Sequence, residues 1–280
     1  MIIDVHTHAF PPEVVKNKEK FLRKDPLFRL IYSKPNARLT TVEGIVHSMD
    51  RTGIEKSVLL GFPWLDHGLV KMHNDYLLEE GRLCRDRVIP FCQARLSQGS
   101  KAAAEIERCV KKGARGVGEL SLENNSRRDT QKAGLSTIAE VLKEYSLPVL
   151  IHVSAVVGRL HSGKGNTDLD QVSQIIAAHP ELDIILAHWG GGLIFFELVP
   201  EIAAMSKHVY YDTAATSYFY LPQIYPVSIQ IVGSDRILFG TDAPLVRPER
   251  QIEDVRSMGL GPEVEKAILG ENAMKLLRIR

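Results

Sequence analysis

Six residues of this 280-residue chain are candidate ligands of divalent metal ions, by their type and by their positions in the sequence. They are His6, His8, Glu119, His152, His188 and Asp242. Imidazole nitrogens and carboxylate oxygens together suit zinc and similar divalent ions. His6 and His8 are two residues apart, so a β-strand would turn both side chains toward the same face. One ion could then be bound by both histidines.

Eight short apolar segments are the elements that we expect to position these residues. They are rich in β-branched residues, which is typical of strands buried on both faces. In chain order, the predicted strands are residues 2–5, 56–60, 88–91, 113–117, 148–153, 183–187, 209–211 and 237–239. Amphipathic stretches of helical length separate most of them. The first such stretch begins at the capping box Thr40-Thr-Val-Glu and ends at Gly53.

Alternation of strands and helices predicts parallel crossovers, and eight such units predict an α/β fold, a closed (β/α)8 TIM barrel. Because the units fill residues 1–280 without a linker, we expect a single domain. Residues 9–39 separate the first strand from its helix, which is long for such a connection. We expect this insertion to lie over the C-terminal face of the barrel, where active sites form. A peripheral decoration or an oligomer contact is the alternative.

The six candidate ligands follow or end the first, fourth, fifth, sixth and eighth predicted strands. The carboxyl ends of barrel strands share one mouth, so we expect these side chains to meet there. Each alone has an ordinary explanation, such as a hydrogen-bonded core histidine or a helix-capping acid. Burying all of them together without a metal would be costly. The set therefore predicts a metal site.

Composition excludes several other classes of protein. The chain is 44% hydrophobic and 25% charged with a net charge of +1, which argues against disorder and against a basic nucleic-acid surface. No apolar run approaches the roughly 18 residues of a membrane span, and the first residues do not resemble a signal peptide. Cys84, Cys92 and Cys109 show no disulfide or zinc-ribbon spacing. We expect a reduced, cytoplasmic enzyme with a small-molecule substrate, and homo-oligomerisation is left open.

Five motifs resemble those of the amidohydrolase superfamily of metal-dependent (β/α)8 barrels, and together they cover nearly the whole chain. They are Asp4-Val-His-Thr-His8, Leu150-Ile-His152, Ala187-His-Trp-Gly-Gly-Gly192, Phe239-Gly-Thr-Asp242 and the closing Gly270-Glu-Asn-Ala-Met-Lys-Leu-Leu277. The chain is most similar to the amidohydrolase 2 branch. That branch holds hydrolases, lactonases and non-oxidative aromatic decarboxylases.

The resemblance implies roles for the candidate ligands. His6 and His8 would bind a first metal, with Asp242 completing its ligands. His152 and His188 would bind a second metal, or support the first if only one ion is present. The resemblance implies a divalent metal cofactor, zinc, as one or two ions.

The fourth strand distinguishes this chain from many relatives, which place a carboxylated lysine there or no ligand. The segment Gly118-Glu-Leu-Ser-Leu-Glu123 contains no lysine. Glu119 resembles instead the bridging glutamate of the TatD-like branch, which favours two metals.

The predicted site suits hydrolysis of an amide, ester, lactone or phosphoester bond in a small substrate, which can carry an anionic group. A metal lowers the pKa of bound water toward about 7, and Asp242 would act as general base and then acid. The first alternative is a metal-dependent lyase, in which Asp242 or His188 protonates carbon while an aromatic or enoate acid loses carbon dioxide. The second alternative is a non-catalytic barrel that only binds metal.

Substrate specificity is expected to come from residues beyond the strand ends. The candidates are Trp64, Arg95, His161, Tyr218 and Arg247. An arginine there could pair with a substrate carboxylate or phosphate. For each candidate, a surface salt bridge or a packed aromatic ring is the alternative explanation.

Overall fold

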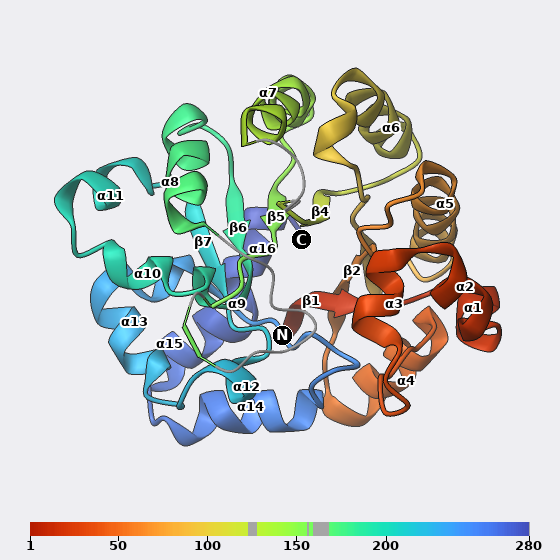
Figure 1. Ribbon diagram of the computed structural model, residues 1–280. Helices are drawn as coiled ribbons and strands as arrows, with labels where there is room; N and C mark the ends of the chain where they lie inside the picture. Colours follow the sequence, from red (N-terminus) through yellow and green to blue (C-terminus); the bar gives the residue numbers. More distant parts are fainter. Residues whose placement is uncertain (123–127, 156, 159–167, 280) are drawn as a thin grey trace.

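A computed structural model describes the chain apart from residues 123–127, 156, 159–167 and 280. Parallel strands lie at the centre, and helices surround them (Figure 1). In chain order the strands are β1 Ile3–His8, β2 Lys56–Leu60, β3 Val88–Pro90, β4 Val117–Leu120, β5 Val149–Ile151, β6 Ile184–Leu186, β7 Val209–Asp212 and β8 Ile237–Leu238.

Hydrogen bonds at two seams close these strands into a barrel. The strands pair as β1-β2-β3 and as β4-β5-β6-β7-β8. Between β8 and β1, the amide of Val5 donates to the carbonyl of Phe239 at 2.9 Å. Between β3 and β4, Cys92 forms a parallel bridge with Val117. The predicted (β/α)8 barrel is therefore confirmed.

Helices follow the strands around the barrel. They are α1 Pro12–Lys16, α2 Lys18–Lys24, α3 Pro26–Tyr32, α4 Val42–Thr52, α5 His67–Leu83, α6 Ser100–Lys111, α7 Arg128–Glu144, α8 Leu169–Ala178, α9 Ala187–Gly190, α10 Leu193–Phe196, α11 Pro200–Met205, α12 Thr216–Phe219, α13 Ile224–Val232, α14 Pro248–Ser257, α15 Pro262–Lys266 and α16 Asn272–Leu277. Within the described residues, no helix is both long and apolar enough to cross a membrane.

The strands are apolar because each one is buried on both faces. In β2, Val58 and Leu60 belong to one buried cluster with residues of the other strands and of α16. Leu59, between them, packs in a second cluster with residues of the surrounding helices. This alternation of side chains along a strand separates the interior of the barrel from its outer layer.

Most predicted strands differ from the observed ones at their ends, and three of the differences involve candidate ligands. The fifth strand ends at Ile151, so His152 follows β5 and does not lie within it. The first strand continues beyond the predicted residues 2–5, so His6 and His8 lie on β1 itself. The fourth strand begins where the predicted segment 113–117 ends, so Glu119 lies within β4 and not beyond it. The prediction used continuous apolar runs, and a polar metal ligand inside a strand interrupts such a run.

The insertion between β1 and α4 folds into α1, α2 and α3 on one side of the barrel mouth (Figure 1). Its side chains Phe10, Phe21 and Phe28 form a buried cluster with Phe62 and Trp64, which follow β2. Aromatic rings in this cluster lie within 4.8–6.3 Å of one another, as in the stacked pair Phe28–Trp64 at 4.8 Å. The insertion is therefore packed firmly onto the barrel.

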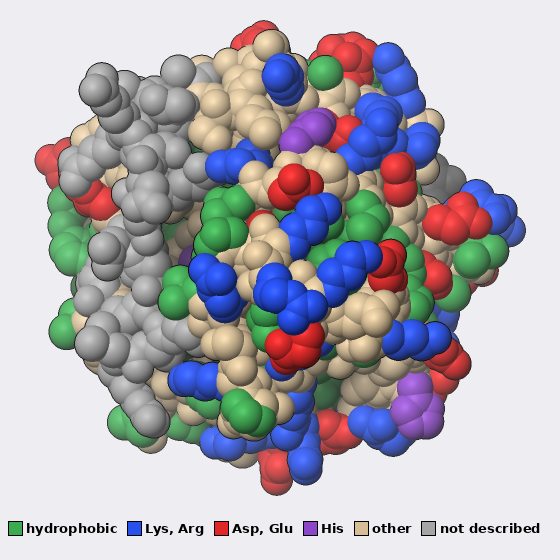
Figure 2. All heavy atoms as spheres, turned by 45° about the vertical axis from the view of Figure 1, so that its right-hand side comes forward, with side chains coloured by type: hydrophobic (Ala, Val, Ile, Leu, Met, Phe, Trp, Pro, Cys, Tyr) green, Lys and Arg blue, Asp and Glu red, His purple; other side chains and the backbone are tan. Residues whose placement is uncertain are grey.

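The insertion is also the most basic part of the chain. Residues 11–40 contain eight Lys and Arg residues and three Asp and Glu residues, although the whole chain has a net charge of only +1. Figure 2 views the molecule from the side of the insertion, and Lys and Arg side chains gather on this face. Positive charge is thus concentrated beside the mouth of the barrel.

Candidate metal centre

All six candidate ligands meet at the carboxyl end of the barrel. Three overlapping groups have ligand atoms within 4.8 Å of one another. The groups are His6–His8–Glu119, His6–His188–Asp242 and Glu119–His152–His188. Residues separated by more than 200 positions in the sequence thus converge because β8 lies next to β1.

Glu119 lies at the centre of the four histidines. Its Oε1 is 2.7 Å from Nδ1 of His152, 3.6 Å from Nε2 of His188 and 3.7 Å from Nε2 of His6. Its other oxygen, Oε2, is 3.6 Å from Nε2 of His8. Burial raises the pKa of this carboxyl, but His152 and His6 outweigh burial and hold the pKa well below the usual value. Glu119 is therefore an anion surrounded by imidazole nitrogens.

The carboxylate of Asp212 orients His6 from behind. Nδ1 of His6 donates to Oδ2 of Asp212 at 2.8 Å, which leaves Nε2 to face the centre. Burial opposes the charged form of His6, but Asp212 and Glu119 raise its pKa to about 10. The other oxygen of Asp212 accepts from the amide of His188 at 2.8 Å. Such support from carboxylates is usual behind metal-binding histidines.

Asp242 completes the centre from the loop after β8. Its Oδ1 is 3.4 Å from Nε2 of His8 and 3.9 Å from Nε2 of His6. Burial raises the pKa of this carboxyl, whereas the hydrogen bond to His8 and the charge of His6 lower it, and the net shift is downward. The amide of Asp242 donates to the carbonyl of His6 at 2.8 Å, which joins the two ligands through the backbone.

His188 and Asp242 both have left-handed backbone conformations. Their φ angles are 56° and 64°. This conformation costs a non-glycine residue roughly 1–2 kcal/mol, and such strain concentrates at functional sites. The side chain of His188 is positioned by a hydrogen bond from its Nδ1 to the carbonyl of Ala214 at 3.1 Å, which leaves Nε2 to face the centre. The fold thus stabilises an unfavourable backbone in order to aim two ligands.

Glu119 depends on the glycine before it. Gly118 has φ +151°, and a Cβ atom there would lie 2.7 Å from the carbonyl oxygen of Leu150 in β5. No larger residue fits without moving one of the two strands. Gly118 therefore lets β4 and β5 approach closely at the position of the ligand.

Tyr32 approaches the site from the insertion, and it was not among the predicted site residues. Its ring packs against Phe10, Phe28 and Phe62 at centroid distances of 5.3, 4.8 and 5.7 Å. Burial first, and then the negative charges of Asp242 and Glu119, raise the pKa of its hydroxyl. The Tyr32 hydroxyl is therefore neutral and lies close enough to these two carboxylates for their charge to act on it. Nothing in its local sequence distinguishes it from other aromatic residues of the insertion.

Asp212 is the second functional residue that sequence reasoning missed. It is fully buried and ends β7, the strand to which no ligand was assigned. The rule that polar residues at barrel strand ends form the site would have found it. The predicted segment 209–211 stopped one residue short of Asp212.

The predicted substrate contacts are dispersed. Trp64 has no exposed surface, and its indole donates to Nδ1 of His73 at 3.0 Å, so it supports the insertion. Arg95 donates to the carbonyl of Leu65. Tyr218 and Arg247 line a groove outside the metal centre. His161 lies outside the described residues.

The donor set fits a divalent metal. Imidazole and carboxylate groups converge without a thiolate, and Nε2 of both His6 and His188 is directed at the centre by a hydrogen bond on the opposite ring nitrogen. Glu119 belongs to two of the three groups, so it could serve one ion or lie between two. The arrangement also places the carboxylate of Asp242, an anion by its lowered pKa, on the partly exposed side of the centre.

Comparisons with known proteins agree with this architecture. The amidohydrolase family model matches residues 3–279. Among curated proteins, none matches the sequence of this chain significantly. Solved structures of the same fold include 5-carboxyvanillate decarboxylase from Sphingomonas paucimobilis, which has a TM-score of 0.81 and 17% identity over 100% of this chain and 99% of that chain.

Two further decarboxylases share the fold. The 2,6-dihydroxybenzoate decarboxylase from Rhizobium has a TM-score of 0.71 and 17% identity, covering 99% of this chain and 98% of that chain. A dihydroxybenzoic acid decarboxylase from a Polaromonas species, solved with manganese and the inhibitor 2-nitroresorcinol, has a TM-score of 0.73 and 20% identity. The alignment covers 99% of this chain and 97% of that enzyme.

Proposed function

Because the chain belongs to the amidohydrolase family, we propose that it is a metal-dependent lyase that releases carbon dioxide from a small aromatic carboxylic acid. The observation that carries this proposal is the whole-length similarity in fold to three decarboxylases of hydroxylated aromatic acids. The sequence favoured hydrolysis, with decarboxylation as its first alternative, and these similarities favour the alternative.

The surroundings of the centre suit an aromatic substrate. The ring of Phe219 lies 5.5 Å from that of His188, and Tyr32, which packs on Phe62, comes from the insertion side, where the charges of Asp242 and Glu119 act on it. Aromatic side chains hold a flat ring through stacked and edge contacts. The hydroxyl of Tyr32 would donate to a substrate carboxylate or phenolate.

A divalent metal bound here would supply the positive charge that orients the substrate carboxylate and stabilises developing negative charge. Manganese is the ion named in the Polaromonas enzyme, and the mixture of imidazole and carboxylate donors suits manganese as well as zinc. We propose a divalent ion held by His6, His8, His188 and Asp242, with Glu119 and His152 beside them.

The protein would contribute proton transfer and positioning. When the carbon–carbon bond to the carboxyl group breaks, its electron pair stays on the ring carbon, and that carbon must receive a proton. Asp242 is the group best placed to deliver this proton, since its side chain is 15% exposed whereas that of His6 is fully buried. Because its lowered pKa leaves it ionised, its carboxylate would first take the proton from the substrate's acidic group or from water and then pass it to the ring carbon. Asp212 would keep His6 fixed during the reaction.

Hydrolysis is the second candidate, and Glu119 favours it. This carboxylate is shared by the groups His6–His8–Glu119 and Glu119–His152–His188, as two neighbouring ions would require. Two-ion centres commonly serve hydrolysis.

One experiment separates these proposals. The metal-loaded protein, prepared separately with manganese and with zinc, is incubated with hydroxybenzoates, 5-carboxyvanillate, aryl lactones and phosphoesters. Carbon dioxide release and hydrolysis products are measured in parallel, with the Asp242→Asn protein as the control. Carbon dioxide release that Asp242→Asn abolishes supports the lyase. Hydrolysis without carbon dioxide overturns it in favour of the second candidate, and bound metal without any turnover points to a non-catalytic barrel.

A further inference from the structure

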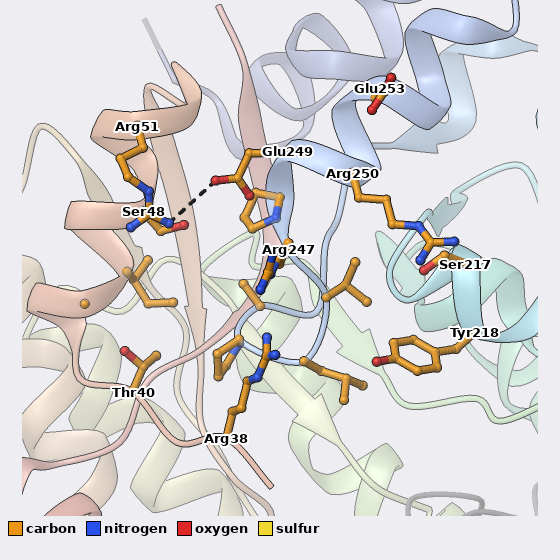
Figure 3. Close-up of a pocket in the computed structure, with 17 residues that line it drawn as sticks. Arg38, Thr40, Ser48, Arg51, Ser217, Tyr218, Arg247, Glu249, Arg250 and Glu253 are labelled. Carbon is orange, nitrogen blue, oxygen red and sulfur yellow. Dashed lines mark ion pairs between the residues drawn. The ribbon is translucent and has the colours of Figure 1, made fainter. Parts of the chain in front are cut away.

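An open groove with a volume of about 980 Å³ lies beside the metal centre. Its walls come from α4, α14, the loop of residues 243–247 and the chain just before α4, and Ser217 and Tyr218 close one end (Figure 3). None of the six candidate metal ligands, all within the described residues, lines the groove. The groove is therefore a feature separate from the centre itself.

Arginine side chains dominate the charge of this groove. Arg51 forms an ion pair with Glu249 at 3.6 Å. Arg38, Arg247 and Arg250 form no ion pair with any carboxylate in the described part of the chain, and all three are exposed. They come from separate places, one before α4 and two at the start of α14.

Figure 3 shows Arg38 and Arg247 reaching into the same part of the groove, and Arg250 lying near Ser217. Like charges held near one another repel, and a bound anion would relieve this repulsion. Guanidinium groups bind carboxylate and phosphate through paired, charge-assisted hydrogen bonds. The only carboxylate in the groove beyond the Arg51 ion pair is that of Glu253, among the described residues.

Much of the rest of the groove is apolar, with Thr40, Ser48 and Ser217 as its uncharged polar side chains. Ile45, Pro244 and Val246 line it, and Leu245 is 49% exposed. The ring of Tyr218 is 63% exposed, with its hydroxyl directed into the groove (Figure 3). A ligand with an apolar body could cover these surfaces while its anionic group meets the arginines.

We propose that this groove binds a small amphipathic anion, a carboxylate or phosphate group on an apolar body, at a site distinct from the metal centre. The two sites share one loop, since Asp242 belongs to the centre and residues 243–247 line the groove. The carbonyl of Asp242 accepts from the amide of Leu245 at 2.8 Å, and the carbonyl of Ala243 accepts from the amide of His8 at 2.8 Å. The anion would thus contact the loop that follows Asp242 and that accepts a hydrogen bond from the backbone of His8.

The test measures binding directly and does not require a known reaction. Benzoate, phenyl phosphate and inorganic phosphate are titrated by calorimetry into metal-loaded protein and again after the metal is removed with a chelator. The double variant Arg38→Gln/Arg250→Gln is compared with Arg82→Gln. Arg82 is an exposed arginine on α5, paired with Glu79 and outside the groove, so it controls for loss of charge.

We expect one benzoate or phenyl phosphate to bind per chain in the metal-free protein and to stay bound when metal is present, and inorganic phosphate to bind more weakly. A second equivalent that binds only in the presence of metal belongs to the metal centre. Loss of charge-assisted hydrogen bonds should weaken binding by about tenfold in the double variant and leave Arg82→Gln unchanged. Preference between the two aromatic probes identifies carboxylate or phosphate as the natural group. Tyr218→Ser, which removes no charge, should weaken the aromatic probes and not inorganic phosphate.

Three results would overturn the proposal. They are the absence of binding to the wild-type protein, binding that disappears with the metal, and an equal loss in Arg82→Gln and the double variant. Thermal unfolding of each variant confirms that it is folded. None of these outcomes depends on whether the protein is a lyase or a hydrolase.

Discussion

Nδ1 of His6 lies 2.8 Å from Oδ2 of Asp212, a residue 206 positions later in the chain. Both side chains are fully buried. The contact joins β1 to β7 across β8, and it directs Nε2 of His6 at the other candidate ligands. Asp212 belongs to none of the three candidate ligand groups found among the described residues, yet its carboxylate sets the orientation of the His6 ring.

Replacement of Asp212 by asparagine should weaken metal binding. The amide keeps the shape of the side chain but loses the negative charge that orients and polarises His6. We expect metal affinity to fall about 10–100-fold, as measured by titration against a chelator. Asp183→Asn is the matched control, because Asp183 also pairs with a histidine, His208 at 3.3 Å, on the exposed surface. Equal affinities for the wild-type and Asp212→Asn proteins would show that Asp212 does not support the centre.

Glu119→Gln tests whether two ions share the centre. If Glu119 lies between two ions, the wild-type protein should bind two per chain and the variant at most one, because an amide oxygen binds cations more weakly than a carboxylate. Elemental analysis after gel filtration gives the stoichiometry. A wild-type protein that holds a single ion would remove the main support for hydrolysis.

Tyr32→Phe tests the contribution of the insertion to substrate binding. The variant keeps the ring contacts with Phe10 and Phe28 and removes only the hydroxyl. Loss of one hydrogen bond to a charged group should lower kcat/KM about tenfold, mainly through KM, and should leave metal content unchanged. Tyr210→Phe, on the half-buried side chain at the middle of β7, is the control. An unchanged KM would mean that Tyr32 does not contact substrate.

The burial of His73 should make the free energy of unfolding of the metal-free protein depend on pH. It is fully buried, donates from Nε2 to the carbonyl of Ala9 at 2.7 Å and accepts at Nδ1 from Trp64. Burial lowers its pKa from 6.5 to about 4. Between these two values the unfolded chain binds a proton that the folded protein does not, so stability falls as the pH decreases.

The contribution of His73 is fully present above pH 6.5 and decreases toward pH 4, by about 3 kcal/mol in total. His73→Gln removes this titration, so the stability difference between wild-type and variant proteins should narrow as the pH falls. Urea unfolding of the metal-free proteins at several pH values measures it. A difference that stays constant from pH 7 to pH 4 would contradict the assignment.

Local sequence was sufficient to predict the barrel and most of the centre. The strands are apolar because they are buried on both faces, and turn residues mark where each one ends, so periodicity alone predicts eight βα units. Gly53, with φ +74°, ends α4 where the sequence predicted, and the helix is capped by Thr41 one residue after the predicted Thr40. Once the strands are in parallel order, their carboxyl ends and the ligands there must share one mouth.

Only the tertiary structure decided which groups touch. The contact between Asp212 and His6 depends on closure of the barrel. The position of Tyr32 near Asp242 and Glu119 depends on the packing of the insertion. Neither relationship leaves a local pattern in the sequence. Burial of Trp64 and the position of Arg247 in a separate groove were equally hidden, because nearness to a strand end does not determine where a side chain lies. Sequence periodicity reports which face of an element is buried, whereas a site is made by contacts between elements that are distant in the chain.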